Sequence, residues 1–95
     1  MAYKIIYLEV ARLNAKEAKA WYKNQEDGLQ IRFAASIKEA IIRLQVNQEA
    51  YEVRYRNIRI AHPYKFPYSI HFYIDKTKNQ IIITNIIHTH RDTDF

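Results

Sequence analysis

The sequence contains no cysteine, only one glycine and only two prolines. Without cysteine the chain can form neither a disulfide scaffold nor a thiolate metal site, which fits the cytosol. A single glycine cannot build a glycine-rich phosphate loop, and no Ser–His–Asp or paired-carboxylate motif is present. The sequence therefore carries no motif of a familiar enzyme class, and we expect no cofactor.

Long hydrophobic runs are also missing. No stretch approaches the roughly 18 apolar residues that a membrane span requires. The apolar residues from Ile5 to Leu8 are too few for the core of a signal peptide, and Glu9 and Arg12 follow them closely. We therefore expect a cytoplasmic protein without a membrane partner.

The chain does have enough apolar material for one packed core. Hydrophobic residues make up 48% and aromatic residues 14% of its 95 residues, which favours a folded globule over disorder. A chain of this length has room for one domain, which we expect to span residues 1–95. The net charge of +5 favours anionic partners such as nucleic acid or an acidic protein.

The first part of the chain is predicted to form a strand and then a helix. Residues 3–8 are β-branched and aromatic, as in a short strand. Asn14, with Glu17 three residues later, resembles a capping box at which the regular helix could begin. A narrow stripe with helical spacing runs along this segment: Ala11, Ala15, Ala18 and Tyr22, with Trp21 beside it.

Gly28 is placed to end the first helix in the left-handed conformation. A second helix is predicted from about residue 29 to residue 47. Its apolar stripe is Leu29, Phe33, Ile37, Ile41 and Leu44. The short connection between the helices predicts an antiparallel helical hairpin.

From residue 51 the apolar period changes to two, which indicates strands. After Arg56-Asn57 the alternation changes phase: Ile58 and Ile60 become the apolar positions, and Arg59 points to the other face. We therefore predict a bulge or tight turn at Arg56-Asn57. His62-Pro63 should end this strand because proline cannot donate to the sheet. A turn at residues 75–79 and a hydrophobic strand at 80–88 complete the chain before a polar tail.

The strand at residues 66–74 is the one around which the others are predicted to assemble. Phe66, Tyr68, Ile70, Phe72 and Ile74 alternate with Pro67, Ser69, His71 and Tyr73. The apolar set should face the helical hairpin, and any function of the sheet should lie on the other face. The order β-α-α-β-β-β predicts an α+β fold, with the helical hairpin packed on one face of an antiparallel sheet.

A dense run of basic residues, Arg54, Arg56, Arg59 and Lys65, is the first candidate contact surface. Such a cluster suits nucleic acid or another acidic target, because it can neutralise phosphates. The alternative is a solvated strand whose charges prevent aggregation. His71 could act as an acid or base beside Arg59, or it could simply be a half-buried neighbour of Tyr73.

The segment His88-Thr-His90-Arg-Asp92 has the alternation of a zinc site. No third firm ligand follows, and short motifs of this kind mislead readily. We therefore predict no metal site, and interpret His88 and Arg91 as structural or partner-binding residues.

The order of these elements, and the residues at their joints, resemble the RelE/ParE superfamily of bacterial toxins from type II toxin–antitoxin modules. The resemblance covers nearly the whole chain. It rests on Trp21-Tyr22, Gly28-Leu29 with Arg32-Phe33, Tyr55 with Ile58-Arg59, Lys65 to Tyr68, and Ile86 to Asp92. The order and spacing are closest to the ParE-like, plasmid-stabilisation branch.

The resemblance implies a cytoplasmic toxin that inhibits growth, neutralised by a cognate antitoxin whose C-terminal segment wraps it. The ParE-like branch implies DNA gyrase as the target and a chain that is not an enzyme. The alternatives are a ribosome-dependent mRNA endonuclease, as RelE-like members are, or a decayed toxin that only binds antitoxin. Ser69 stands where those nucleases have an arginine, and Phe95 about where they have a tyrosine, which favours the first interpretation. The oligomeric state is left open.

The candidate site residues follow from the resemblance and from the basic run. The candidates for antitoxin binding are Trp21, Tyr22, Phe33 and Ile37. The candidates for contact with the target or with nucleic acid are Arg54, Arg56, Arg59, Lys65, His88 and Arg91. If the chain were an endoribonuclease, its catalytic candidates would be Arg59, His71 and Arg91.

Overall fold

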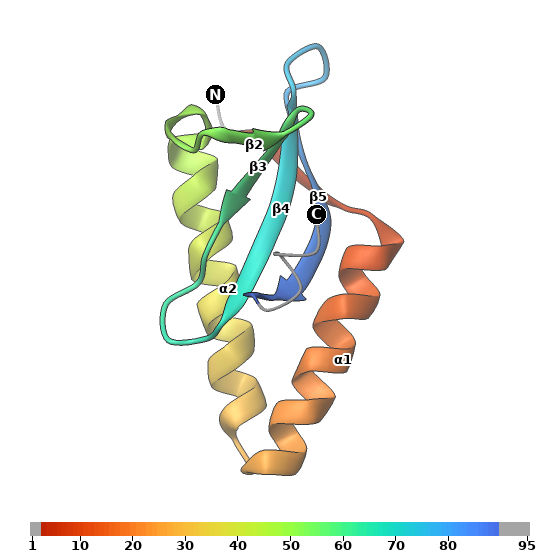
Figure 1. Cartoon of the computed structure of the whole chain (residues 1–95), viewed down its shortest axis with the longest axis vertical. Helices are drawn as coiled ribbons and strands as arrows, with labels where there is room; N and C mark the ends of the chain where they lie inside the picture. The colour runs from red at the N-terminus through yellow and green to blue at the C-terminus, as the bar shows by residue number, and fades with distance from the viewer. Residues whose placement is uncertain (1–2, 90–95) are drawn as a thin grey trace.

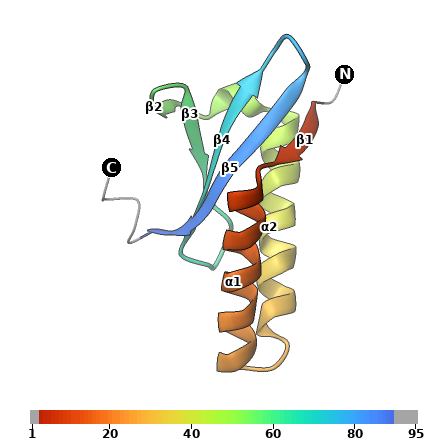
Figure 2. The same ribbon diagram turned by 90° about the vertical axis from the view of Figure 1, so that its right-hand side faces the viewer.

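The computed structural model of the chain describes residues 3–89. Two α-helices form a hairpin on one side of a five-stranded sheet (Figures 1 and 2). The elements are β1 (Lys4–Tyr7), α1 (Glu9–Gln25), α2 (Leu29–Val46), the short 3-10 helix η1 (Gln48–Ala50), β2 (Val53–Tyr55), β3 (Ile58–Ala61), β4 (Tyr68–Asp75) and β5 (Gln80–His88). The predicted α+β class and the helical hairpin are confirmed.

The sheet has the strand order β1-β5-β4-β3-β2. Strands β2 to β5 form the predicted antiparallel meander, but β1 pairs with β5 in parallel, from Lys4 opposite Gln80 to Tyr7 opposite Ile83. The sheet is therefore mixed rather than antiparallel throughout. The two strands of the parallel pair stand at the two ends of the sequence, so no turn between them sets their direction.

Pairing of β4 with β5 is interrupted at one point. His71 lies opposite Asn85 while Phe72 lies opposite Ile83, so Thr84 is an extra residue on β5. The hydroxyl of Thr84 donates to the carbonyl oxygen of His71 at 3.3 Å, across this bulge. The alternation of faces along β5 therefore changes at Thr84.

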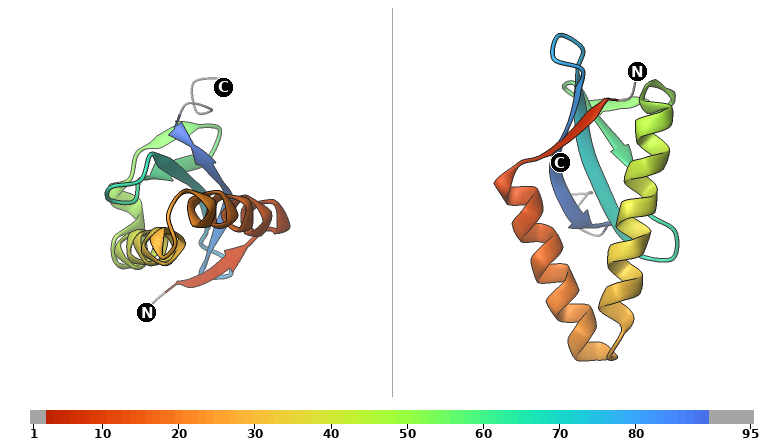
Figure 3. Two further views of the ribbon diagram at one scale, coloured as in Figure 1. Left: turned by 90° about the horizontal axis from the view of Figure 1, so that it is seen from below. Right: turned by 180° about the vertical axis from the view of Figure 1, so that it is seen from behind.

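The core lies between the sheet and the helical hairpin, which covers one face of the sheet (Figure 3). The second helix contributes the predicted stripe, and the first contributes its small residues. The buried core side chains include Ala11, Ala18, Tyr22, Phe33, Ile37, Ala40, Ile41, Leu44, Ile70, Phe72, Ile81, Ile83 and Ile86. The apolar set predicted on β4 faces the helices, as expected. No helix within residues 3–89 combines the length and apolar character needed to cross a membrane.

Gly28 adopts the predicted left-handed conformation, with φ of +95°. Its position differs from the prediction, because Glu26 is the C-cap of α1 and Gly28 is the N-cap of α2. Arg56, in the turn between β2 and β3, has φ of +50°. The predicted phase shift at Arg56-Asn57 is therefore a tight turn between two antiparallel strands.

The first helix begins at Glu9 rather than at Asn14, so the predicted capping box is wrong. The side chain of Asn14 has another partner: its Oδ1 accepts a hydrogen bond from the backbone N–H of Ile86 at 3.0 Å. Strand β1 ends at Tyr7 and covers β5 only as far as Ile83. Asn14 thus satisfies a backbone donor of β5 that no neighbouring strand reaches.

This contact predicts a specific stability loss. Asn14→Ala should lower the free energy of unfolding by about 1–3 kcal/mol, because it leaves the part-buried Ile86 N–H without its acceptor. The measurement is urea denaturation followed by circular dichroism. Asn24→Ala, at an exposed position of the same helix, is the matched control and should change stability by much less. Equal losses in the two variants would contradict the assigned role of Asn14.

Candidate functional site

The face of β4 that points away from the helices, where we expect any function of the sheet, is closed to solvent at two of its polar residues. Ser69 and His71 are both 0% exposed. The Tyr55 hydroxyl lies 2.8 Å from Nδ1 of His71, and the two rings meet edge to face at 5.7 Å between centroids. His71 is therefore buried beneath the β2 strand, and reagents in solution do not reach it in this structure.

Arg59 faces the helices and not the outer face of the sheet. Its partner across the β3–β4 pair is Phe72, which belongs to the core, and residues opposite each other in an antiparallel pair share a face. Its guanidinium Nη1 donates to the carbonyl oxygens of Glu49, at 3.2 Å, and Tyr51, at 2.5 Å. Arg59 thus links β3 to the segment that follows α2 through these two hydrogen bonds. Replacing it would remove this link as well as a positive charge.

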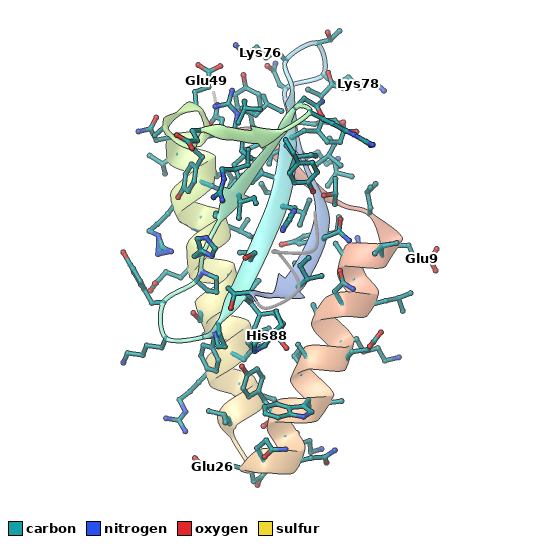
Figure 4. All side chains as sticks on the ribbon, in the orientation of Figure 1. Glu9, Glu26, Glu49, Lys76, Lys78 and His88 are labelled. Carbon is teal, nitrogen blue, oxygen red and sulfur yellow. The ribbon has the colours of Figure 1, made fainter. Side chains whose placement is uncertain are left out.

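The four basic residues of the predicted run do not form one patch. Arg54 and Arg56 are exposed on the β2–β3 hairpin, whereas Lys65 lies in the loop that follows the other end of β3. Two exposed lysines that the sequence pattern did not single out, Lys76 and Lys78, lie in the β4–β5 turn (Figure 4). A sequence pattern does not show which turns share one end of a sheet, because that depends on strand pairing.

A groove of about 500 Å³ runs along one flank of α1, between this helix and the ends of β4 and β5. We call it the tryptophan groove. It is lined by Asn14, Glu17, Ala18, Trp21, Tyr22, Pro67, Tyr68, Ile86, Ile87 and His88. Trp21 is 56% exposed at its rim, and the His88 and Tyr68 rings are in edge contact at 5.4 Å between centroids. The groove therefore presents a polar and aromatic surface.

Tyr22 joins the tryptophan groove to the core. Its ring contacts those of Trp21, Phe33 and Phe66, each at 5.1 Å between centroids. Burial, and to a smaller extent the neighbouring Tyr68, raise the pKa of the Tyr22 phenol above its usual value of 10.0. Tyr22 is thus a neutral, packed side chain at ordinary pH.

A second groove, of about 480 Å³, lies on the opposite flank of α1, between α1 and α2. We call it the helical groove. Small and apolar residues form its floor, and Arg12, Lys16, Lys19 and Lys38 surround them; the full lining is Tyr7, Ala11, Arg12, Ala15, Lys16, Lys19, Phe33, Ala34, Ile37, Lys38 and Ile86. Burial raises the pKa of the Tyr7 phenol, an effect that the charge of Arg12 partly offsets. The helical groove therefore has an apolar floor and a basic rim.

The predicted antitoxin-binding residues fall on these two grooves. Trp21 and Tyr22 line the tryptophan groove, and Phe33 and Ile37 lie at the floor of the helical groove. Only Trp21 is widely exposed, because the other three belong to the core stripe of the hairpin. The basic rim of Arg12, Lys16, Lys19 and Lys38 was missed. The spacing of four and then three residues between the first three, all on α1, was the available signal. Lys38 lies on α2 and joins them only through the packing of the two helices.

The remaining candidates concern the chain end. Within residues 3–89, no three His, Cys, Asp or Glu side chains come close enough to hold a metal ion. His88 is half-buried in the tryptophan groove. Arg91, His90 and Asp92 lie outside the described residues, so their predicted roles stay predictions.

No protein-family model and no curated protein sequence matches the chain, but solved structures resemble it. A chain of the chromosomal ParDE TA system from P. aeruginosa superposes with a TM-score of 0.77 at 15% identity, covering 92% of this chain and 96% of that one. A chain of the RelBE2 toxin–antitoxin complex from Mycobacterium tuberculosis superposes with a TM-score of 0.68 at 16% identity, covering 93% and 99%. The predicted RelE/ParE-like fold is thereby confirmed.

The raised pKa of Tyr22 predicts how stability depends on pH. The folded state holds this phenol proton more firmly than the unfolded chain does, so the contribution is complete below the ordinary tyrosine pKa of 10.0 and is lost as pH rises through the raised pKa. We expect Tyr22→Phe, which keeps the ring contacts, to lose less stability between about pH 9 and pH 11.5 than the parent chain. Urea unfolding at each pH measures this.

The control for this measurement is Tyr64→Phe, at a tyrosine that is 62% exposed. Its pH dependence should match that of the parent chain. If Tyr22→Phe and Tyr64→Phe behave alike, the burial of Tyr22 does not determine the alkaline loss of stability.

Proposed function

We propose that this chain is the toxin of a type II toxin–antitoxin module, neutralised by a small acidic antitoxin. The observation that carries the proposal is the fold, because both solved structures described above are of toxin–antitoxin systems and each likeness spans nearly the whole of both chains. The net charge of +5 is consistent with an acidic protein partner.

The helical groove is the proposed seat of an antitoxin segment. An amphipathic segment could place apolar side chains on the floor of alanines and carboxylates against the rim. Lys16, Lys19 and Lys38 have no ion-pair partner among residues 3–89, so their charges are available to such a segment. A segment that folds as it binds could follow the groove along α1.

The edge strand β1 and the exposed Trp21 extend this proposed interface around α1. Among residues 3–89, one edge of β1 faces no other strand, so an extended segment could pair with it. Trp21 lies on the other flank of the helix and is the largest exposed aromatic side chain. An antitoxin that wraps α1 would contact the groove, the helix and the edge together.

For the cellular target we propose DNA gyrase, which the resemblance to the ParE-like branch implies. The positions of two catalytic candidates support binding rather than hydrolysis. His71 is buried, and the guanidinium of Arg59 is engaged by two backbone carbonyls. Neither is positioned to act on an RNA phosphate at the surface of this structure.

Two assays test the proposed function. Induced expression of the chain in bacteria should arrest growth, and purified protein should inhibit DNA supercoiling by gyrase in vitro. Growth arrest without any effect on gyrase, accompanied by cleavage of mRNA on ribosomes, would replace the gyrase target with the endonuclease alternative. Absence of growth arrest, with antitoxin binding retained, would identify a chain that only binds antitoxin.

Charge reversal in the helical groove tests the antitoxin site. Lys16→Glu/Lys19→Glu should weaken binding of the copurified antitoxin by about tenfold or more, because it sets carboxylates against carboxylates. Isothermal titration at two salt concentrations measures the effect, which should shrink at high salt. Lys23→Glu/Lys65→Glu is the matched control, since it changes net charge equally at exposed residues outside the groove. Equal weakening by both pairs would count against this site.

A further inference from the structure

One end of the sheet gathers exposed cations from three separate parts of the chain. Antiparallel pairing of β3 with β4 places the turn at Arg56 beside the end of β4, where the β4–β5 turn begins. The backbone N–H of Lys4 donates to the carbonyl oxygen of Asn79 at 2.9 Å, which brings β1 to the same turn. We call this surface the basic end; its cations are Lys4, Arg54, Arg56, Lys76 and Lys78.

Most of these cations form no ion pair with the part of the chain that the structure describes. Lys76 pairs with Glu49 at 2.5 Å (Figure 4), but Lys4, Arg54, Arg56 and Lys78 make no ion pair within residues 3–89. Besides Glu49, the nearby carboxylates belong to Glu52 and Asp75, and Oδ1 of Asp75 accepts the backbone N–H of Lys78 at 3.2 Å. The end therefore carries an excess of positive charge.

The two turns that present these cations have defined backbones. Arg56 has φ of +50° and Asn79 has φ of +53°, the left-handed conformation of tight turns. The contact of Asp75 with Lys78 closes the second turn, and the Lys76–Glu49 pair connects it to η1. The hairpin centres are two strand spacings apart, about 10 Å. Along about 10 Å of its helix axis, one strand of a nucleic-acid duplex carries roughly three phosphates.

The chemistry of the basic end fits nucleic acid better than an acidic protein. Protein interfaces have a buried apolar centre, whereas phosphate contacts are made by cations and by polar side chains. Val53 is the one large hydrophobic residue of the β2–β3 hairpin and β4–β5 turn that is exposed. Between the cations stand the exposed polar residues Asn57, Thr77 and Asn79.

We propose that the basic end binds the phosphate backbone of nucleic acid, with Arg54, Arg56 and Lys78 as principal contacts. This site goes beyond the proposed toxin function and does not depend on it. Lys76 and Lys78 lie at the opposite end of the molecule from Glu26, which marks the tip of the helical hairpin (Figure 4). None of the cations of the basic end lines the helical groove. A complex with a segment in that groove would therefore still bind nucleic acid.

Fluorescence anisotropy tests the proposal, with a labelled single-stranded RNA and a labelled DNA duplex of the same length, over a series of salt concentrations. The test variant is Arg54→Gln/Arg56→Asn/Lys78→Gln, in which asparagine suits the left-handed turn position. We expect both probes to bind the parent chain without sequence preference. In the variant, the slope of log K against log salt should fall by about 2.1 for the single-stranded RNA and about 2.7 for the DNA duplex, because three phosphate contacts are lost.

The control is Lys23→Gln/Arg32→Gln, which removes two exposed charges from the helical hairpin at residues with no proposed binding role. This control should keep most of the parent chain's dependence of log K on log salt. Tighter binding of one probe identifies RNA or DNA as the ligand and supports the proposal. An equal loss of slope per removed charge in the control and in the triple variant would overturn the proposal. The absence of salt-dependent binding would also overturn it, as would equal competition by poly-glutamate, which would indicate a protein partner. None of these outcomes depends on toxicity.

Discussion

The structure depends on the pairing of β4 with β5 and on the extra residue, Thr84, that interrupts it. Because side chains alternate along a strand, a regular β5 could not direct both Ile83 and Ile86 toward the helices. The bulge corrects the phase, so that both lie in the core. The bulge also lets the Ile86 N–H donate its hydrogen bond to Asn14 Oδ1. It places His88 on the face of β5 that lines the tryptophan groove. One inserted residue therefore determines how α1 meets the sheet.

The two grooves follow from the small residues of α1. Ala11 and Ala18, 0% and 5% exposed, let this helix approach the sheet and α2 closely. Short side chains cannot fill the space on either flank of the contact, so a groove remains on each side. The flanks differ in chemistry because Trp21 and Lys19 project in different directions from the same helix. One stripe of alanines thus creates two surfaces for partners.

Local sequence patterns predicted the helices and strands well, but they predicted less well which polar side chains would be exposed. The alternation along β4, the left-handed Gly28 and the turn at Arg56 all depend on neighbours in the sequence, and the structure has them as expected. The inward position of Arg59 depends on carbonyl groups at the end of α2, which no strand pattern reveals. The burial of His71 likewise depends on Tyr55, which lies on a different strand.

The charges proposed to act in binding contribute little to the stability of the fold. The ion pairs among residues 3–89 are few and join exposed or partly exposed side chains, and such pairs are worth about 0–1 kcal/mol each. The fold is stabilised instead by the apolar core between hairpin and sheet. The cations of the helical groove and of the basic end can therefore be exchanged without loss of the fold. Because they occupy separate surfaces, net charge alone could not have distinguished one binding site from two.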